Sequence, residues 1–179
     1  MVNQRIHLPL SNLHCTRWRG LLRIRYSNVF DQVLIVAGSE TTATVLAGTT
    51  YLLLANPDAL AKVVAEVRTA FSSPSEVNFL SARKLPYLMA CLEESMRCFP
   101  PIPGLNPRRT VEPVVVDGNA IPPGTYLGVH QWAAYHSPLN FMHPELYAPE
   151  RWLPGHGMTD QKDVLQPFSI GPRNCIGKR

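Results

Sequence analysis

The longest apolar stretch of the chain runs over residues 28–55 and reads NVFDQVLIVAGSETTATVLAGTTYLLLA. A helix of this length could cross a bilayer. The stretch also contains Glu40, two glycines and five threonines, and an acid in mid-membrane costs about 2.5–3.5 kcal/mol on insertion scales. The pattern therefore favours a helix buried in the core of a large protein over a membrane span.

Two shorter helical segments follow, and a proline stands at the start of each. Asn56 and Pro57 predict the end of the long helix and the start of the next, with Asn56 as N-cap and Pro57 in the first turn. Apolar residues then recur at helical spacing over 60–71, which predicts an amphipathic helix. Pro86 opens a third helix, which must end at Phe99 because two prolines come next.

Short strands and turns are predicted after Phe99, where most of the 17 prolines lie. Apolar residues at 114–116 and 120–121 flank Asp117-Gly118-Asn119, which predicts a β-hairpin. The fold class predicted from this pattern is mainly α with small β-hairpins.

Positive charge is concentrated at the start of the chain. The formal net charge is +4, and residues 1–27 hold five arginines and no acid. This basic arm is compatible with binding to nucleic acid or to a membrane surface, or with a mitochondrial presequence. An arm of unknown structure is the favoured interpretation. No apolar h-region follows it, which excludes a secretory signal.

The four cysteines are Cys15, Cys91, Cys98 and Cys175, and none forms a C-x-x-C pair. This spacing argues against a zinc knuckle. On one helix Cys91 and Cys98 would lie roughly 10 Å apart, too far for a disulfide. The pattern predicts reduced thiols.

Cys175 lies in the sequence FSIGPRNCIG, whose residue types suit a thiolate that binds a metal. Gly171 permits a positive φ, so the backbone can fold tightly and direct N–H groups at the sulfur. Phe168 can cover the site, and Arg173 adds a positive charge. A buried structural cysteine beside a turn is equally compatible with these residues.

Four segments of the chain resemble motifs of the cytochrome P450 family. The F-x-x-G-x-R-x-C-x-G loop of the family is matched by Phe168, Gly171, Arg173, Cys175 and Gly177. Glu94 and Arg97 resemble the E-x-x-R of its K helix. PERW at 149–152 resembles the loop that carries a further arginine, and AGSETT at 37–42 resembles the oxygen-activating part of its I helix. Their order also agrees with that of the family.

The resemblance implies a haem-thiolate monooxygenase with Cys175 as the axial ligand of the iron of haem b. An anionic sulfur donates electron density to the iron and favours O–O cleavage. Thr41 and Glu40 are implied as the residues that relay protons to the distal oxygen.

Haem propionates require cationic partners, and the resemblance implies Arg173 and Arg108. Arg108 stands ten residues before Gly118, in the strand region that reaches the haem edge in the family. Arg109 is the neighbouring alternative.

Glu94 and Arg97 are three residues apart and therefore neighbours on one helix face. On a surface such a pair contributes only a few tenths of a kcal/mol. The resemblance implies instead that it is buried with Arg151, as a costly and specific lock on the loop that carries the cysteine. We assign this cluster a structural role.

The resemblance covers residues 28–179 and predicts a partial cytochrome P450 fold, from the I helix to the haem-binding cysteine loop. The expected domains are a basic arm at 1–27 and an incomplete C-terminal core at 28–179. The N-terminal helices and most of the L helix of the family are absent from this sequence. The long helix is therefore expected to leave apolar faces uncovered.

The sequences of these motifs are similar to those of filamentous-fungal members of the family. This implies oxidation of a small lipophilic substrate by O₂ in secondary metabolism, with electrons from NADPH through NADPH–cytochrome P450 reductase and no nucleic-acid partner. A full-length relative would lie at the endoplasmic reticulum membrane, on its cytosolic face. This chain has no clear membrane anchor, which leaves a cytoplasmic location open.

Two alternatives to the monooxygenase remain. One is a truncated, non-catalytic remnant that binds haem weakly or not at all. The other is a protein that binds nucleic acid or membranes through the basic arm, which predicts salt-sensitive binding.

Overall fold

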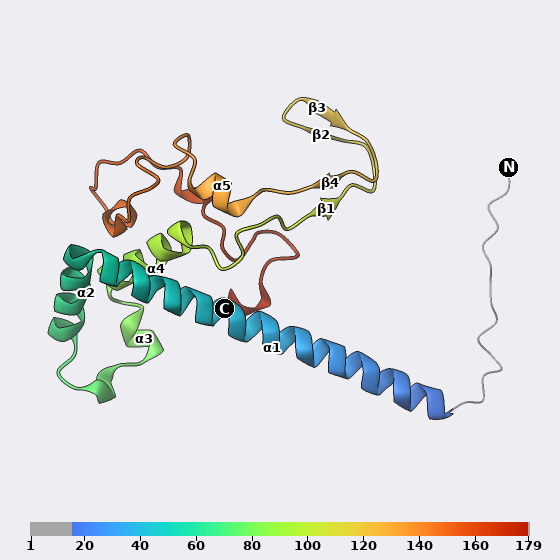
Figure 1. Cartoon of the computed structure of the whole chain (residues 1–179), viewed down its shortest axis with the longest axis horizontal. Helices are drawn as coiled ribbons and strands as arrows, with labels where there is room; N and C mark the ends of the chain where they lie inside the picture. The colour runs from blue at the N-terminus through green and yellow to red at the C-terminus, as the bar shows by residue number, and fades with distance from the viewer. Residues whose placement is uncertain (1–15, 179) are drawn as a thin grey trace. The chain divides into compact units, whose positions relative to one another are not determined.

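The computed structural model describes residues 16–178, and their side chains from residue 31 onward. It divides into two units, Met1–Ser39 and Glu40–Arg179. Helix α1 (Thr16–Ala55) accounts for the described part of the first unit and continues into the second (Figure 1). The sequence pattern predicts this helix only from residue 28. It begins earlier because the preceding residues include leucine, isoleucine and arginine and no proline.

The fold is mainly α-helical with small antiparallel sheets, as the sequence predicts. The helices after α1 are α2 (Pro57–Ala70), α3 (Phe79–Ala82), α4 (Pro86–Cys98) and α5 (Gln131–Tyr135). The strands are β1 (Arg108–Arg109), β2 (Val114–Val116), β3 (Asn119–Ile121) and β4 (Tyr126–Leu127). Short 3-10 helices are η2 (Pro74–Glu76), η3 (Pro149–Trp152), η4 (Lys162–Val164) and η5 (Ile176–Lys178).

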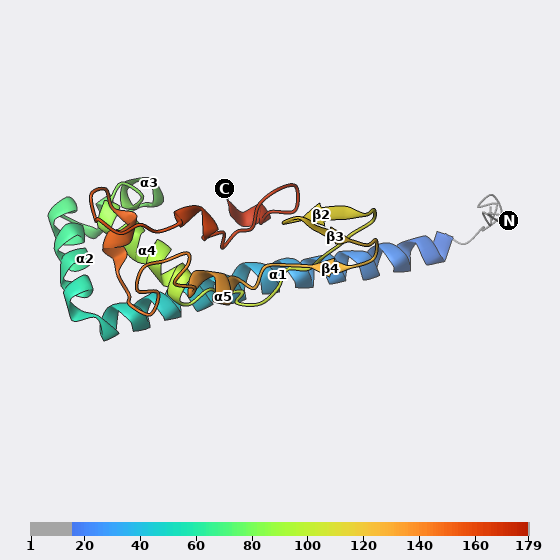
Figure 2. The same ribbon diagram turned by 90° about the horizontal axis from the view of Figure 1, so that it is seen from above.

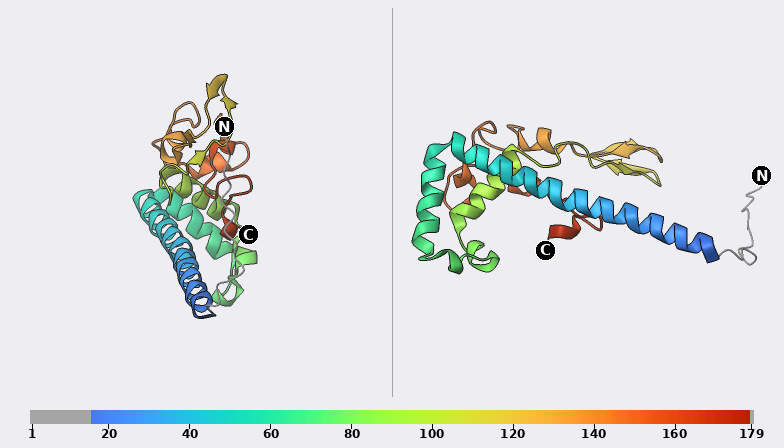
Figure 3. Two further views of the ribbon diagram at one scale, coloured as in Figure 1. Left: turned by 90° about the vertical axis from the view of Figure 1, so that its right-hand side faces the viewer. Right: turned by 60° about the horizontal axis from the view of Figure 1, so that its bottom comes forward.

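The chain turns sharply between α1 and α2 (Figure 3). Asn56 occupies the N-cap position of α2, and Pro57 lies in the first turn, as predicted. The Asn56 side chain, however, makes no capping bond to α2. Its Nδ2 donates to the carbonyl of Leu52 at 2.8 Å, so this side chain closes α1 instead. Helix α2 then buries Val63 against α4.

Strands β2 and β3 form the predicted hairpin (Figure 2). The two turn residues, Asp117 and Gly118, have φ angles of +48° and +75°. Two consecutive positive φ angles are typical of the tight turn whose twist matches that of paired strands. Asn119, predicted in the turn, is instead the first residue of β3 and pairs with Val116. A second antiparallel pair, β1 and β4, lies beside this hairpin in the chain.

Apolar side chains of α1 remain exposed, as expected. They are Val33, Leu34, Ile35, Val36, Leu46, Tyr51 and Leu54. Near its C-terminal end, α1 approaches Phe99 so closely that a Cβ at Gly48 would lie 2.7 Å from the ring. Among the described residues, no helix combines the length and the apolar character that a membrane span requires.

The interior of the second unit contains charged side chains as well as apolar ones. Tyr135, Phe141 and Leu165 form one apolar cluster. The largest fully buried side chains are nevertheless those of Arg97 and Arg151. Burying a charge is costly unless it is paired and hydrogen-bonded, so the partners of these two arginines define the first part of the site.

Candidate functional site

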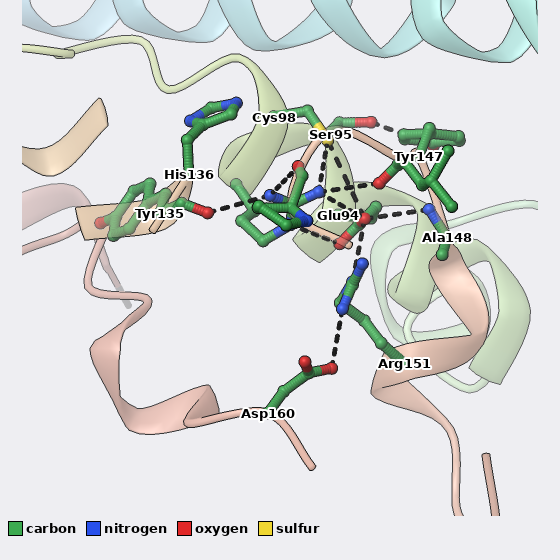
Figure 4. Close-up of polar contacts among 12 residues, drawn as sticks. Glu94, Ser95, Cys98, Tyr135, His136, Tyr147, Ala148, Arg151 and Asp160 are labelled. Atoms are coloured by element: carbon green, nitrogen blue, oxygen red, sulfur yellow. Dashed lines mark hydrogen bonds and ion pairs between the residues drawn. The ribbon is translucent and has the colours of Figure 1, made fainter. Parts of the chain in front are cut away.

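Glu94 and Arg97 lie one turn apart on α4, and η3 brings Arg151 to them (Figure 4). All three side chains are fully buried. Arg97 donates to both oxygens of Glu94, from Nη2 to Oε1 at 2.9 Å and from Nε to Oε2 at 3.0 Å. Arg151 Nε donates to Oε1 at 3.0 Å. The structure therefore brings together the three residues of the implied lock.

The Glu94 carboxylate also accepts two hydrogen bonds from outside this triad. Trp152 Nε1 donates to Oε2, and the backbone N–H of Ala148 donates to Oε1, each at 2.9 Å. A carboxylate that is removed from water needs its lone pairs filled in this way. Neither donor was identified from the sequence, although Trp152 directly follows Arg151.

Arg97 uses its remaining N–H groups to hold backbone carbonyls. Nη1 donates to the carbonyls of Tyr135 at 2.9 Å and Pro144 at 2.8 Å, and Nη2 donates to that of Leu146 at 2.9 Å. Burial lowers the pKa of Arg97, but its hydrogen bond to Glu94 and the charge of Glu94 outweigh this effect, and the net pKa is raised. The guanidinium thus stays charged and fixes residues 135–146 to α4.

Asp160 is a further acid of this cluster, and sequence reasoning missed it. Its side chain is 0% exposed, and Oδ2 accepts from Arg151 Nη1 at 2.8 Å. Oδ1 accepts the backbone N–H of Met142 at 2.7 Å. Asp160 lies in a loop without periodicity, where no local signal separates it from Asp163. We call Glu94, Arg97, Arg151 and Asp160 the charge cluster; its two acids balance its two bases.

The ring of Phe141 lies near both guanidinium groups of the charge cluster. Its centroid is 5.4 Å from Arg97 Cζ and 5.9 Å from Arg151 Cζ. A desolvated cation over an aromatic face gains about 2 kcal/mol. Phe141 therefore joins the charge cluster to the apolar core.

The second part of the site is the cysteine loop, residues 168–178. Ser169 and Gly171 have φ angles of +59° and +80°, and this left-handed geometry favours glycine. The chain folds back so that the Cys175 N–H donates to the Phe168 carbonyl at 2.8 Å. The Cys175 side chain is exposed. The alternative of a buried structural cysteine is therefore wrong for this structure.

The other two described cysteines differ from Cys175 in their surroundings. Cys91 is fully buried, and burial raises the pKa of its thiol to about 11. Burial also raises the pKa of Cys98 to about 12, with its Sγ 3.0 Å from Arg97 Nη2. Neither thiol is exposed to a ligand as that of Cys175 is. Cys15 lies outside the described residues.

The residues implied as haem neighbours lie at exposed positions. Phe168 is 38% exposed, and Arg173 is also exposed. Arg108 is exposed on β1, where Nη1 donates to the nearby carbonyls of Asn106 at 3.3 Å and Pro107 at 3.2 Å.

Arg109, the alternative to Arg108, is held within its own sheet. Its Nε donates to the carbonyl of Gly124 at 3.3 Å, and its guanidinium lies 5.7 Å from the centroid of the Tyr126 ring. Successive residues of a strand point to opposite faces. This arrangement favours Arg108 over Arg109 as the arginine that can meet a ligand.

Glu40 and Thr41 lie on α1, where Glu40 is exposed and Thr41 is partly buried. Their role in relaying protons stays a prediction. Among residues 16–178, no three His, Cys, Asp or Glu side chains converge into a site for a metal ion. A haem iron differs from such an ion in that a single thiolate is enough as its protein ligand.

Comparison with known sequences identifies relatives of this chain. The model of the family described as Cytochrome P450 matches residues 29–179. The chain is 49% identical over 149 residues to "Cytochrome P450 monooxygenase FUM2" of Gibberella moniliformis, which covers 82% of this chain and 32% of that protein. It is 46% identical over 155 residues to "Trichothecene C-4 hydroxylase" of Trichoderma arundinaceum, with 81% and 31% covered. The chain thus spans about a third of the length of these curated relatives.

Solved structures with the same fold are also known. The chain is similar to a zebra fish cytochrome P450 determined with progesterone, with a TM-score of 0.70, 33% identity and coverage of 81% of this chain and 32% of that one. The heme domain of a cytochrome P450DA mutant gives a TM-score of 0.72 at 27% identity, with 82% and 33% covered.

Proposed function

Because this chain belongs to the cytochrome P450 family, we propose that it forms the haem-binding part of a haem-thiolate monooxygenase in which Cys175 ligates the iron. The observation that carries this proposal is the exposed Cys175 thiol on a loop that is folded back by Gly171. The thiols of Cys91 and Cys98, with pKa values raised by burial, are the contrast.

The side chains around Cys175 fit haem b, an apolar disc with two carboxylates. Phe168, Ile170 and Ile176 are exposed apolar side chains of the cysteine loop. Arg108 and Arg173 would hold the carboxylates, because neither has an acidic partner within residues 16–178. Arginine suits this purpose, since its guanidinium can donate two parallel hydrogen bonds to one carboxylate.

A thiolate-ligated haem supplies the activation of O₂ and the transfer of one oxygen atom to the substrate. The residues of this chain would prepare that chemistry. The charge cluster holds the segments that support the cysteine loop. Glu40 and Thr41, both on α1, would bind water and pass protons to the bound O₂.

The substrate we propose is a small lipophilic metabolite of a fungal secondary pathway. Two observations support this class: the identity to the monooxygenase FUM2 and to a trichothecene C-4 hydroxylase, both fungal. Electrons would come from NADPH through NADPH–cytochrome P450 reductase. The complete protein would work at the cytosolic face of the endoplasmic reticulum membrane.

The proposal is tested by the absorption spectrum of the reduced, carbon-monoxide-bound chain expressed with added haem. We expect the red-shifted Soret band of thiolate ligation in the unchanged chain and in Cys98→Ser. Cys175→Ser should lose it. Loss of the band in Cys98→Ser alone would refute the ligand assignment. No band in the unchanged chain would refute haem ligation by this chain and favour the non-catalytic remnant.

A further inference from the structure

Tyr135, the last residue of α5, contacts the charge cluster and also Gln166, which lies two residues before the cysteine loop. Its carbonyl accepts a hydrogen bond from Arg97 of the charge cluster at 2.9 Å (Figure 4). Its hydroxyl accepts the backbone N–H of Gln166 at 3.0 Å. The residue is 1% exposed, so water does not compete for either bond. Tyr135 thereby joins α4 to the segment that leads into the cysteine loop.

Gln166 is held from its other side as well. Its carbonyl accepts from Gln131 Nε2 at 3.3 Å. The preceding residue, Leu165, is buried against Tyr135. Two residues further on, the Phe168 carbonyl accepts the N–H of Cys175 at 2.8 Å. The position of Gln166 therefore sets where the cysteine loop begins.

The hydroxyl of Tyr135 can be separated from the ring that carries it. The ring fills space beside Phe141 and Leu165, and phenylalanine would fill the same space. Removing the hydroxyl alone leaves the Gln166 N–H without its acceptor, and an unpaired backbone N–H away from water is unfavourable. Burial raises the pKa of Tyr135, so the hydroxyl remains neutral and protonated at physiological pH.

We propose that Tyr135 is a positioning residue for the haem ligand. Arg97 fixes the backbone of Tyr135, the Tyr135 hydroxyl fixes Gln166, and Gln166 fixes the start of the loop that presents Cys175. This role rests on the proposed function of Cys175. The first test is nevertheless independent of haem, because it follows the loop itself.

Hydrogen exchange of the whole chain, followed by mass spectrometry, tests this proposal. We expect Tyr135→Phe to accelerate exchange at least about tenfold in residues 166–175 and to leave α4 unchanged, because only one acceptor is lost. The matched control is Tyr126→Phe, which removes an exposed hydroxyl from β4. Unchanged exchange in residues 166–175 would overturn the proposal. So would an equal acceleration in α4, because it would indicate a general loss of packing.

Gln131→Leu is a milder variant that removes the bond from Gln131 to the Gln166 carbonyl, which still accepts the N–H of Ser169. It should accelerate the same segment less than Tyr135→Phe does, and no acceleration there would count against the proposal. With haem added, Tyr135→Phe should also lower the share of the thiolate band relative to Tyr126→Phe. Absence of that band in the unchanged chain would refute the proposed function. Unchanged exchange in Tyr135→Phe would refute this inference, so the two failures are distinguishable.

Discussion

The charge cluster and the cysteine loop differ in how completely the chain satisfies their chemical groups. In the charge cluster, Glu94 accepts five N–H groups within 3.0 Å. The loop, in contrast, exposes the Cys175 thiol and the apolar side chains of Phe168, Ile170 and Ile176. The hydrogen-bonding groups of Glu94 are thus satisfied by residues of this chain. The cysteine loop instead exposes groups that suit a ligand.

This difference indicates that the buried charges and the exposed polar groups of the chain have different roles. A buried ion pair gains little net stability, because the cost of desolvation offsets much of the attraction. What the charge cluster supplies is position: Arg97 alone holds the carbonyls of three residues, Tyr135, Pro144 and Leu146. We infer that the chain fixes its framework with buried charges and thereby leaves the loop free to present its thiol.

The largest effect is expected when the charge cluster loses Glu94. Glu94→Gln removes the charge between two buried arginines, and breaking a buried pair in this way costs about 3–5 kcal/mol. Total stabilities are only about 5–15 kcal/mol. We therefore expect Glu94→Gln to lower the free energy of unfolding in urea by about this amount, or to yield chain that does not unfold cooperatively.

Glu93→Gln is the matched control for this substitution. Burial raises the pKa of Glu93, an effect that the charge of Lys178 opposes. A carboxyl with a folded pKa above its unfolded one works against folding when it is ionised at pH 7. We expect Glu93→Gln to change stability by less than about 0.5 kcal/mol. A loss equal to that of Glu94→Gln would show that any carboxyl on α4 matters as much.

A smaller loss is expected for Asp160→Asn. The amide keeps one acceptor for Met142 N–H but loses the charge that faces Arg151, which retains Glu94. Hydrogen bonds to charged groups contribute about 1.5–3 kcal/mol, and we expect a loss in this range by urea unfolding. Asp163→Asn, three residues further on at an exposed position, should have no measurable effect. Equal losses in both would exclude a specific role for Asp160.

In the cysteine loop, loss of an arginine should weaken haem binding and leave stability almost unchanged, the opposite of the effect in the charge cluster. Arg173→Gln is expected to leave the free energy of unfolding of the haem-free chain within about 0.5 kcal/mol, because Arg173 is exposed. It should weaken haem binding about tenfold, through the loss of one charge-assisted contact worth about 1.4 kcal/mol. Haem titration followed by absorbance measures this change. A lower free energy of unfolding with unchanged haem affinity would contradict this prediction, because it would assign Arg173 to the framework and not to haem binding.

How far the sequence predicts each region depends on how local its signals are. Pro86 marks the start of α4, and the spacing of Glu94 and Arg97 places both on one face. The F-x-x-G-x-R-x-C-x-G pattern likewise marks the cysteine loop, because glycine and cysteine are required at fixed positions. Each of these features can be predicted from residues that are close together in the sequence.

The contacts that the sequence did not predict join residues that are distant in the chain. Asp160 and Tyr135 lie in segments without periodicity, and their partners become neighbours only after folding. The carbonyls that Arg97 holds carry no side-chain signature at all. Asn119 was placed in the turn for a related reason: asparagine suits a turn position, but the register of the hairpin puts it in β3.

The last prediction concerns the rates at which the thiols of the folded chain react, and it involves no change in the free energy of unfolding. At pH 8, a thiol with a pKa of about 12, as for Cys98, is thiolate in only about one molecule in ten thousand. For Cys91, with a pKa of about 11, the fraction is about one in a thousand. Cys91 is also buried and Cys98 is partly buried, whereas Cys175 is exposed. An aromatic disulfide reagent should therefore label Cys175 at least about a hundredfold faster than either.

Peptide mapping by mass spectrometry measures each rate separately and keeps Cys15 apart from the other three. Labelling in urea provides the control, since all thiols should then react at similar rates. If Cys98 reacted as fast as Cys175 in the folded chain, the last turn of α4 would have to open beside Arg97. The charge cluster would then be no more closed to solvent than the cysteine loop. The distinction between a buried structural cluster and a loop that exposes its thiol would fail.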